Sequence, residues 1–400
     1  MTNQYEIRPI SDKEFGKFSE TSARAFGFDQ DAGYLSLKKS YFDFDRTLAV
    51  IHNNGIVGGC VSSKYLLNIP GNQANVAAIS DVSVLPNHRR KGLLTKMMRS
   101  QLLDLHDRGE LFAALWAEES PIYGRFGYGI GSLHENWIIH RQNNAFNTRI
   151  NDNGIVEYID RTKIEKLLPE IYKNATTDVP AVIQRPEMYW KVISEDFESK
   201  RNNESKMQHV IYRLDKDIKG YASYRTVSEG ISIHELMATD LNSTVGLWRF
   251  CLDMDLRLQA QIYRRPLDDI LPMLLIDPGK LSRTIKEGLW LRLLNVQKAL
   301  ELRKYSLETR LVLKVIDSFC DWNNQTFELH ASDNENLCTP SSLKPDICIS
   351  ASDLASVYLG TIKFSTLLKC GRIQIETDTA VLKADMMFSY KHAPWSPFYF

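Results

Sequence analysis

The stretch His88-Arg-Arg-Lys91 gathers three cationic side chains and an imidazole in one turn, and such side chains suit the binding of a phosphate. The residues before it, Val82-Ser-Val84, have the pattern of a β-strand, and Pro86 and Gly92 bracket the turn. Where a strand leads through such a turn into a helix, unpaired backbone N–H groups meet the positive end of the helix dipole. Gly92 lets the backbone approach a ligand closely because it has no Cβ. The sequence therefore predicts a pyrophosphate site.

The residues after Gly92 predict the helix that this site requires. Apolar side chains recur at helical spacing, at Leu93, Leu94, Met97, Met98, Leu102, Leu103 and Leu105. The turn is neither a Walker loop nor a dinucleotide fingerprint, so nucleotide hydrolysis and hydride transfer are disfavoured. A basic turn that is only solvated is the ordinary alternative. The strand, the glycine and the amphipathic helix together favour a ligand site over that alternative.

The pattern V-x-V-x-P-x-H-R-R-x-G-L-L resembles the acetyl-CoA-binding motif of the GNAT acetyltransferases. In that family the backbone of the strand end and of the turn holds the pantetheine arm and the pyrophosphate. By position, the resemblance implies that the pantetheine meets Val82, Ser83 and Val84. It implies that the phosphates meet Arg90, Lys91, Gly92, Leu93, Leu94 and Thr95. Acetyl-CoA is thus the expected co-substrate, and no metal is expected.

A second informative stretch runs from Glu118 to Gly131 and holds four glycines between aromatic residues. Core aromatics with satisfied hydroxyls are the ordinary interpretation of Tyr123 and Tyr128. The string Y-G-R-F-G-Y-G, however, resembles the Eis (enhanced intracellular survival) branch of the acetyltransferases. This resemblance implies that Tyr123 is the proton donor beside the thioester sulfur. It also implies that Glu118 and Glu119 occupy cofactor-contacting positions.

The last seven residues, Pro394-Trp-Ser-Pro-Phe-Tyr-Phe400, include four aromatic side chains, whereas chain ends are usually polar. When docked, these side chains would bury roughly 150–250 Å² each, and in water they would form an apolar patch. We therefore expect the tail to dock, and the ordinary alternative is that it closes its own domain. The Eis resemblance implies that it enters the active site of the first domain, where the terminal carboxylate of Phe400 takes part in catalysis.

Composition and charge restrict the class of protein. The 400 residues suffice for two or three domains, and 44% are apolar and 24% charged. The 49 basic and 49 acidic residues balance, which argues against a general binder of nucleic acid or of membranes. We expect no membrane-spanning segment and no signal peptide. The six scattered cysteines lack metal-ligand spacing, so we expect neither a zinc site nor disulfides, and a cytoplasmic location.

The order of strand-like and helix-like segments predicts the fold class. A hairpin over 47–66, a strand over 74–84 and an apolar central strand over 111–117 indicate an α/β mixed sheet with helices on both faces. From 155 to 286 the order restarts without a second basic turn. This part resembles a degenerate copy of the first fold, so we expect it to wall the substrate cleft and make subunit contacts without catalysis.

The stretch Gly288-Leu-Trp-Leu-Arg-Leu-Leu-Asn-Val296 also resembles the Eis branch and marks the start of the last domain. The sequence beyond it predicts only an α+β fold, and the resemblance implies a sterol-carrier-protein-like domain. The predicted domains are a catalytic GNAT domain at 1–150, a degenerate second GNAT-like domain at 151–287, and the sterol-carrier-protein-like domain at 288–400, whose tail reaches the active site.

The predicted function is an acetyl-CoA-dependent N-acetyltransferase that transfers acetyl directly to a primary amine in a ternary complex. No Ser-His-Asp or Cys-His signature is visible, and direct transfer needs none. An aminoglycoside, a polyamine or a lysine-type amine fits, and the sequence does not select among them. The alternative is an acyl-CoA or lipid-binding sensor or carrier without turnover. The resemblance implies a homo-hexamer, and neither nucleic acid nor membrane is an expected partner.

Overall fold

The computed structural model describes residues 5–147, 150 and 153–400, which divide into two units. The first unit comprises residues 1–132, 288–394 and 399–400, and the second comprises 133–287 and 395–398. Each unit is built around a seven-stranded sheet, and the first also holds a five-stranded sheet. No helix in the described part of the chain is long and apolar enough to cross a bilayer.

The seven-stranded sheet of the first unit is mixed. Its strands, in spatial order, are β1 (Glu6–Arg8), β2 (Thr47–His52), β3 (Gly55–Ile69), β4 (Asn72–Val84), β5 (Phe112–Trp116), β14 (Leu289–Leu293) and β6 (Gly129–Ile130). The predicted hairpin is confirmed, because Asn53 and Asn54 turn between β2 and β3 with φ angles of 48° and 61°. The apolar run of β5 is buried between β4 and β14, as a central strand requires.

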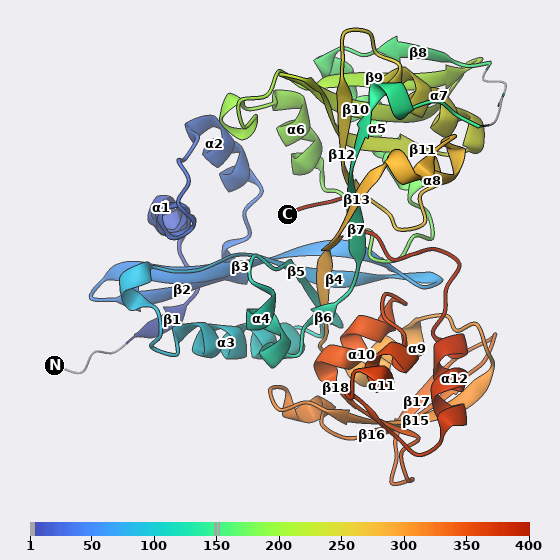
Figure 1. Cartoon of the computed structure of the whole chain (residues 1–400). Helices are drawn as coiled ribbons and strands as arrows, with labels where there is room; N and C mark the ends of the chain where they lie inside the picture. The colour runs from blue at the N-terminus through green and yellow to red at the C-terminus, as the bar shows by residue number, and fades with distance from the viewer. Residues whose placement is uncertain (1–4, 148–149, 151–152) are drawn as a thin grey trace. The chain divides into compact units, whose positions relative to one another are not determined.

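Helices cover both faces of this sheet, as predicted. They are α1 (Phe15–Phe26), α2 (Ala32–Ser40), α3 (Leu93–Asp107) and α4 (Ser120–Tyr123). Figure 1 shows α1 on one face of the sheet and α3 on the other. Helix α3 buries the apolar side chains predicted from its spacing, except Leu94, which is half-buried, and Leu103, which is exposed. The helix begins at Leu93, directly after the turn that follows β4.

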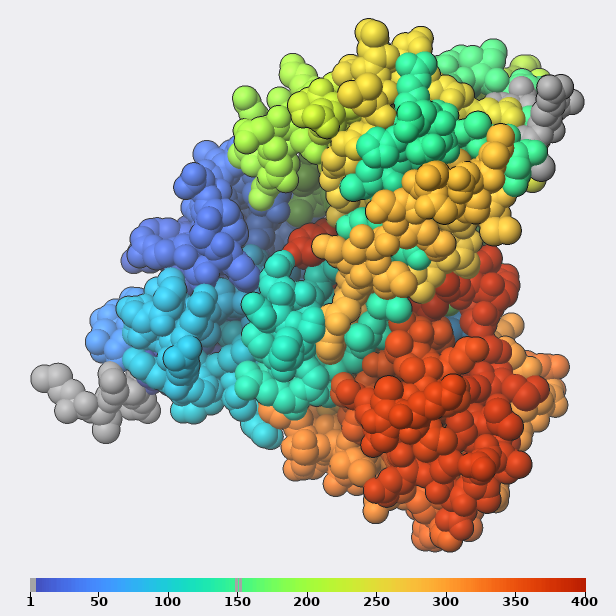
Figure 2. Space-filling model, in the orientation of Figure 1, coloured from blue at the N-terminus to red at the C-terminus, as the bar shows by residue number. Residues whose placement is uncertain are grey.

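The five-stranded sheet of the first unit comes from the last quarter of the chain. Its strands, in spatial order, are β17 (Leu337–Pro340), β16 (Thr326–Ala331), β15 (Thr309–Ile316), β18 (Ile347–Ser350) and β19 (Gln374–Ile375). The helices are α9 (Val296–Leu302), α10 (Ala351–Tyr358), α11 (Phe364–Lys369) and α12 (Asp378–Met387). In the space-filling view the red residues of this part lie in front of its orange residues (Figure 2). The α+β prediction is thus confirmed.

The second unit repeats the plan of the first sheet. Its strands, in spatial order, are β8 (Ile155–Tyr158), β9 (Gln208–Leu214), β10 (Asp217–Val227), β11 (Gly230–Ala238), β12 (Gln259–Arg265), β7 (Leu133–His140) and β13 (Ser282–Glu287). Its helices are α5 (Ile164–Ala175), α6 (Glu187–Glu195), α7 (Leu241–Leu252) and α8 (Leu271–Leu274). The parallel pair β11–β12 with its connecting helix α7 matches β4–β5 with α3.

The strand pairings do not follow the predicted domain bounds of 1–150, 151–287 and 288–400. Strand β7 precedes residue 150 but pairs with β12 and β13, and β14 follows residue 288 but pairs with β5 and β6. Each seven-stranded sheet thus takes one strand from beyond its predicted segment. Strands β12 and β13 escaped sequence analysis, because β13 (Ser282–Glu287) is exposed at all six positions and has no apolar alternation.

Candidate active site

The site begins where two parallel strands separate. Strands β4 and β5 pair from Val76 with Phe112 to Ile79 with Leu115, and β4 then continues to Val84 paired only with β3. Backbone groups of the last residues of β4 on the β5 side therefore have no strand partner. Val82, Ser83 and Val84 lie in this separated segment, where an extended ligand can pair with the strand edge.

A turn rich in unpaired N–H groups follows the strand. Arg90 and Gly92 have φ angles of 61° and 74°, so the backbone turns through left-handed conformations on both sides of Lys91. Gly92 is the N-cap of α3 and offers no side-chain cap, and the first helical hydrogen bond runs from Lys96 N to Gly92 O. Among the described residues, the N–H groups of 93–95 have no acceptor. Such a turn, together with the positive end of the helix dipole, suits an anion.

The four basic or imidazole side chains of the turn differ in their hydrogen-bond partners. Arg89 fixes the turn, since its guanidinium donates to the carbonyl oxygens of Val84 (3.0 Å) and Ala25 (3.2 Å). The Tyr5 hydroxyl pairs with His88 Nδ1 at 3.0 Å and accepts from Lys91 Nζ at 3.2 Å.

The guanidinium of Arg90 is exposed and has no partner among the described residues. Of the two predicted phosphate-binding cations, Arg90 is therefore the one that is free to pair with a ligand, while Lys91 is engaged by Tyr5.

Tyr123 ends α4, the short helix that follows β5. Its side chain is 9% exposed, and its ring lies 6.0 Å from that of Tyr128 in a T-shaped contact. Burial, with smaller contributions from Cys60 and Glu118, raises the pKa of Tyr123 to about 12. The hydroxyl is therefore protonated and can donate a hydrogen bond. The Tyr128 hydroxyl is fully buried and has no partner among the described residues.

The last two residues of the chain belong to the first unit. The Tyr399 hydroxyl donates to Glu118 Oε1 at 2.6 Å, and its ring lies 5.1 Å from that of Trp116, the last residue of β5. The ring of Phe400 lies 6.1 Å from that of Tyr65 on β3. The side chains of Tyr399 and Phe400 thus lie against residues of the first unit's seven-stranded sheet and of the segment that follows β5. The Glu118 carboxylate accepts this hydrogen bond from Tyr399, whereas Glu119, the other glutamate predicted to contact the cofactor, is exposed.

Sequence analysis missed Asp81, which has a φ angle of 54° in the irregular part of β4. Its carboxylate accepts from Lys38 Nζ on α2 at 2.6 Å and from Ser22 Oγ on α1 at 3.1 Å. These contacts hold both helices to the point where β4 leaves β5. The available signal was the single charged residue of this strand, directly before the motif.

The second unit lacks this apparatus. Strand β11 leads almost directly into α7, where Asp240 caps the helix by accepting from Ser243 N at 2.8 Å. The carboxylate therefore occupies the place that an anion would take. This unit also holds Trp395, whose indole Nε1 donates to Arg264 O at 2.7 Å, and Phe398, whose ring lies 4.7 Å from that of Tyr189. These aromatic residues are docked, as predicted for the tail.

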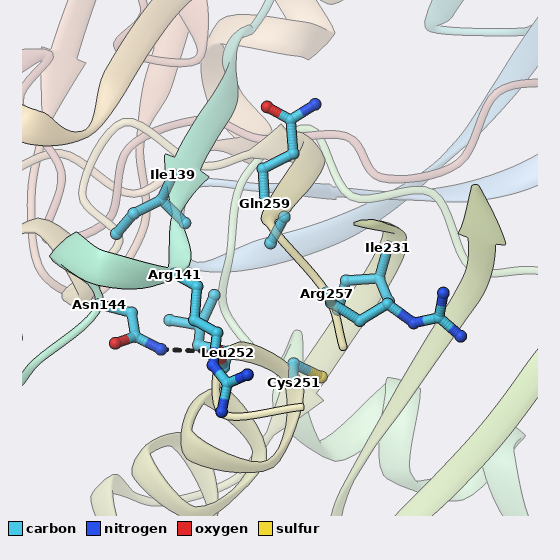
Figure 3. Close-up of a pocket in the computed structure, with 9 residues that line it drawn as sticks. Ile139, Arg141, Asn144, Ile231, Cys251, Leu252, Arg257 and Gln259 are labelled. Carbon is cyan, nitrogen blue, oxygen red and sulfur yellow. Dashed lines mark hydrogen bonds between the residues drawn. The ribbon is translucent and has the colours of Figure 1, made fainter. Parts of the chain in front are cut away.

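A small pocket in the second unit lies at the other end of its parallel strands. Its residues include Ile231 and Gln259 near the starts of β11 and β12, with Arg257 and Asn144 (Figure 3). The Asn144 amide donates to Leu252 O at 2.7 Å. The pocket thus lies at the amino ends of these strands, whereas coenzymes bind at the carboxyl ends of such strands. No group of metal-ligating side chains occurs among the described residues.

Comparisons with known proteins agree with this geometry. Residues 6–131 and 181–293 each match a family model described as an acetyltransferase (GNAT) domain, and residues 296–397 match one described as a sterol carrier protein domain. An uncharacterized N-acetyltransferase of Streptomyces griseus is 31% identical over 89% of both chains. The N-acetyltransferase Eis of Mycobacterium tuberculosis is 29% identical over 84% of this chain and 83% of its own.

The solved structure of Eis1 from Mycobacterium abscessus superposes with a TM-score of 0.87 at 28% identity, over 99% of this chain and 100% of that one. The order of the family matches confirms the predicted fold class of two acetyltransferase-like domains followed by a sterol-carrier-protein-like domain. The predicted domain bounds themselves stay predictions.

Arg90→Glu should raise the Kd for coenzyme A about 10-fold, or by ~1.4 kcal/mol, because the one free guanidinium of the turn would become a repelling carboxylate. Titration calorimetry measures this without an acceptor amine. Lys314→Glu, an exposed charge reversal on β15, is the matched control and should leave the Kd unchanged. An unaltered Kd for Arg90→Glu would exclude Arg90 from the phosphate site.

Proposed function

Because the chain belongs to the Eis-like branch of the GNAT N-acetyltransferases, we propose that it transfers acetyl from acetyl-CoA directly to a primary amine in a ternary complex. One observation carries the proposal: an open strand edge leads into an uncapped helix. The edge of β4 on the β5 side has no strand partner beyond Ile79, and among the described residues the N–H groups in the first turn of α3 have no acceptor. The edge suits the amides of a pantetheine arm, and the turn suits its pyrophosphate.

Among the described residues, Cys60 is not suited to act as a covalent nucleophile at this site. Cys60, the cysteine that interacts electrostatically with Tyr123, is fully buried, and burial raises the pKa of its thiol well above the ordinary value. Such a thiol is inert. In direct transfer the amine nitrogen bonds to the acetyl carbon, the carbon–sulfur bond breaks, and the amine loses a proton. A backbone N–H of Val82–Val84 is our proposed donor to the developing oxyanion.

Tyr123 is proposed to donate a hydrogen bond to the departing sulfur. A thiol has a pKa of about 8.5, and burial holds the pKa of Tyr123 at about 12. Complete proton transfer from the phenol would therefore run roughly 5 kcal/mol uphill, at ~1.36 kcal/mol per unit. A hydrogen bond stabilises the thiolate without this cost, so hydrogen bonding is the role that the surroundings of Tyr123 favour.

The terminal carboxylate of Phe400 is proposed to orient the amine and accept its proton. An alkyl ammonium has a pKa of about 10.4 and a terminal carboxyl about 3.5, so removing the proton beforehand would cost roughly 9 kcal/mol. The transfer becomes favourable once the nitrogen is bonded to the acetyl carbon and turns acidic. The contacts of Tyr399 with Trp116 and Glu118 support a terminus held near the end of β5.

The family resemblance supports the proposal that the acceptor is an aminoglycoside, a polyamine or a lysine-type amine. It likewise supports the proposal that the protein is a cytoplasmic hexamer. The alternative is a sensor or carrier that binds acyl-CoA or lipid without turnover. Release of free coenzyme A thiol from acetyl-CoA in the presence of an amine panel, with mass spectrometry of the products, should show amine-dependent acetylation. Binding without any thiol release would favour the carrier.

Tyr123→Phe should lower kcat about 10- to 1,000-fold and leave the Kd for coenzyme A nearly unchanged, because it removes only the donor to the sulfur. Tyr128→Phe is the matched control on the same loop, and it should leave kcat nearly unchanged because that hydroxyl has no partner among the described residues. Steady-state kinetics at several pH values measures both variants. A Tyr123→Phe enzyme with the parent kcat would refute the donor role.

One glycine added after Phe400 moves the terminal carboxylate by about 3.5 Å. We expect it to lower kcat at least about 100-fold while the melting temperature stays unchanged, because the aromatic residues of the tail remain. A glycine added before Met1 is the control for chain extension. Full activity of the C-terminally extended enzyme would rule out the carboxylate as the base.

A further inference from the structure

We infer that the last domain positions Tyr123, through Ser352 and Ser356 on α10 and through the buried pair Arg292–Asp317. These are positioning residues: Arg292, Ser352 and Ser356 contact the segment that follows Tyr123, and Asp317 holds Arg292. The inference rests on the proposed role of Tyr123 as donor to the sulfur. It assigns to the sterol-carrier-like domain a task in acetyl transfer.

Helix α10 holds the backbone of the loop at two points. Ser352 Oγ donates to the carbonyl oxygen of Tyr128 at 2.6 Å, and Ser356 Oγ accepts from the backbone N–H of Ile130 at 3.0 Å. A Cβ added to Gly129 would lie 2.0 Å from Ser352 O, so the loop can lie this close to the helix only because residue 129 is glycine. The loop is thus held against α10 by two hydrogen bonds and by the close packing at Gly129.

A buried ion pair supports the next part of the loop. Arg292 on β14 is fully buried and its Nη2 lies 2.5 Å from Asp317 Oδ2, directly after β15. Asp317 also accepts from the backbone N–H of Cys320 at 2.9 Å, which fixes its carboxylate. A Cβ on Gly127 would lie 2.6 Å from Arg292 Cζ, so the guanidinium packs against the loop backbone.

Apolar contacts complete the support. The ring of Phe126 meets that of Phe319 at 5.0 Å in a T-shaped contact, and Tyr123, Phe126 and Tyr128 share one core with Trp290 and Cys320. The backbone N–H of Tyr128 donates to Tyr123 O at 3.4 Å, which links the supported part of the loop to Tyr123 itself.

Order in this loop has to come from outside it. Glycine occupies three of the seven positions from Tyr123 to Gly129, and a glycine-rich segment has many conformations of similar energy. A donor must be held within a fraction of an ångström of its acceptor, since a misplacement of about 1 Å can lower the rate about 100-fold. The contacts from Arg292, Ser352 and Ser356, with Asp317 holding Arg292, supply this order.

The test is a double-mutant cycle of Ser352→Ala with Tyr123→Phe, measured by kcat, by the KM for acetyl-CoA and by melting temperature. Ser352→Ala should lower kcat about 10-fold without changing the KM. In the Tyr123→Phe background the same change should lower kcat less than about 2-fold, because the residue being positioned is already disabled. Ser352→Thr, which keeps the hydroxyl, should restore kcat.

Ser350→Ala is the matched control, because Ser350 Oγ caps the same helix at Asp353 N and does not contact the loop. It should lower the melting temperature but leave kcat within about 2-fold of the parent. Equal losses from Ser352→Ala in both backgrounds, or no loss in either, would overturn the inference while the donor role of Tyr123 stands. A Tyr123→Phe enzyme with the parent kcat would instead remove the donor role, and the inference with it.

Discussion

The separation of β4 from β5 is the constraint on which the rest of the first unit depends. Strand edges inside a protein must find hydrogen-bond partners, and here pairing stops after Ile79 and Leu115 although β4 continues to Val84. The opened edge suits a ligand because the turn after β4 places unpaired N–H groups next to it. The segment after β5 carries Tyr123, and the chain terminus lies against Trp116 at the end of the same strand.

The position of β14 in the first seven-stranded sheet explains why the core around Tyr123 contains a buried ion pair. Because β14 is fully buried between β5 and β6, its Arg292 has no access to water. A cation in such a place needs a buried partner, and Asp317 provides it from the last domain. Removing one member of such a pair typically costs about 3–5 kcal/mol. The last domain is therefore an integral part of the first unit.

The two related sheets differ at one helix N-terminus. Gly92 leaves the first turn of α3 open to an anion, whereas Asp240 fills the corresponding place on α7 with its own carboxylate. The N-cap residue thus decides whether the first turn of the helix stays open or is capped by its own carboxylate. The burial of Tyr123 has two consequences, because it raises the pKa of the phenol to about 12. The hydroxyl stays protonated and can donate a hydrogen bond, but it is a poorer acid.

The sequence by itself determined the turn that leads into α3, the hairpin at Asn53-Asn54, the helix α3 and the family, because local spacing and turn residues encode each of them. It also predicted Arg90–Thr95 as the phosphate-binding residues. Only the tertiary structure decided which sheet receives β7 and β14, that Glu118 is taken by Tyr399, and that Asp81 and Asp317 hold Lys38 and Arg292. Periodicity identifies a strand but not its partner. Pairings between residues far apart in the chain, such as Glu118 and Tyr399 at a separation of 281 positions, depend on the packing of the whole unit.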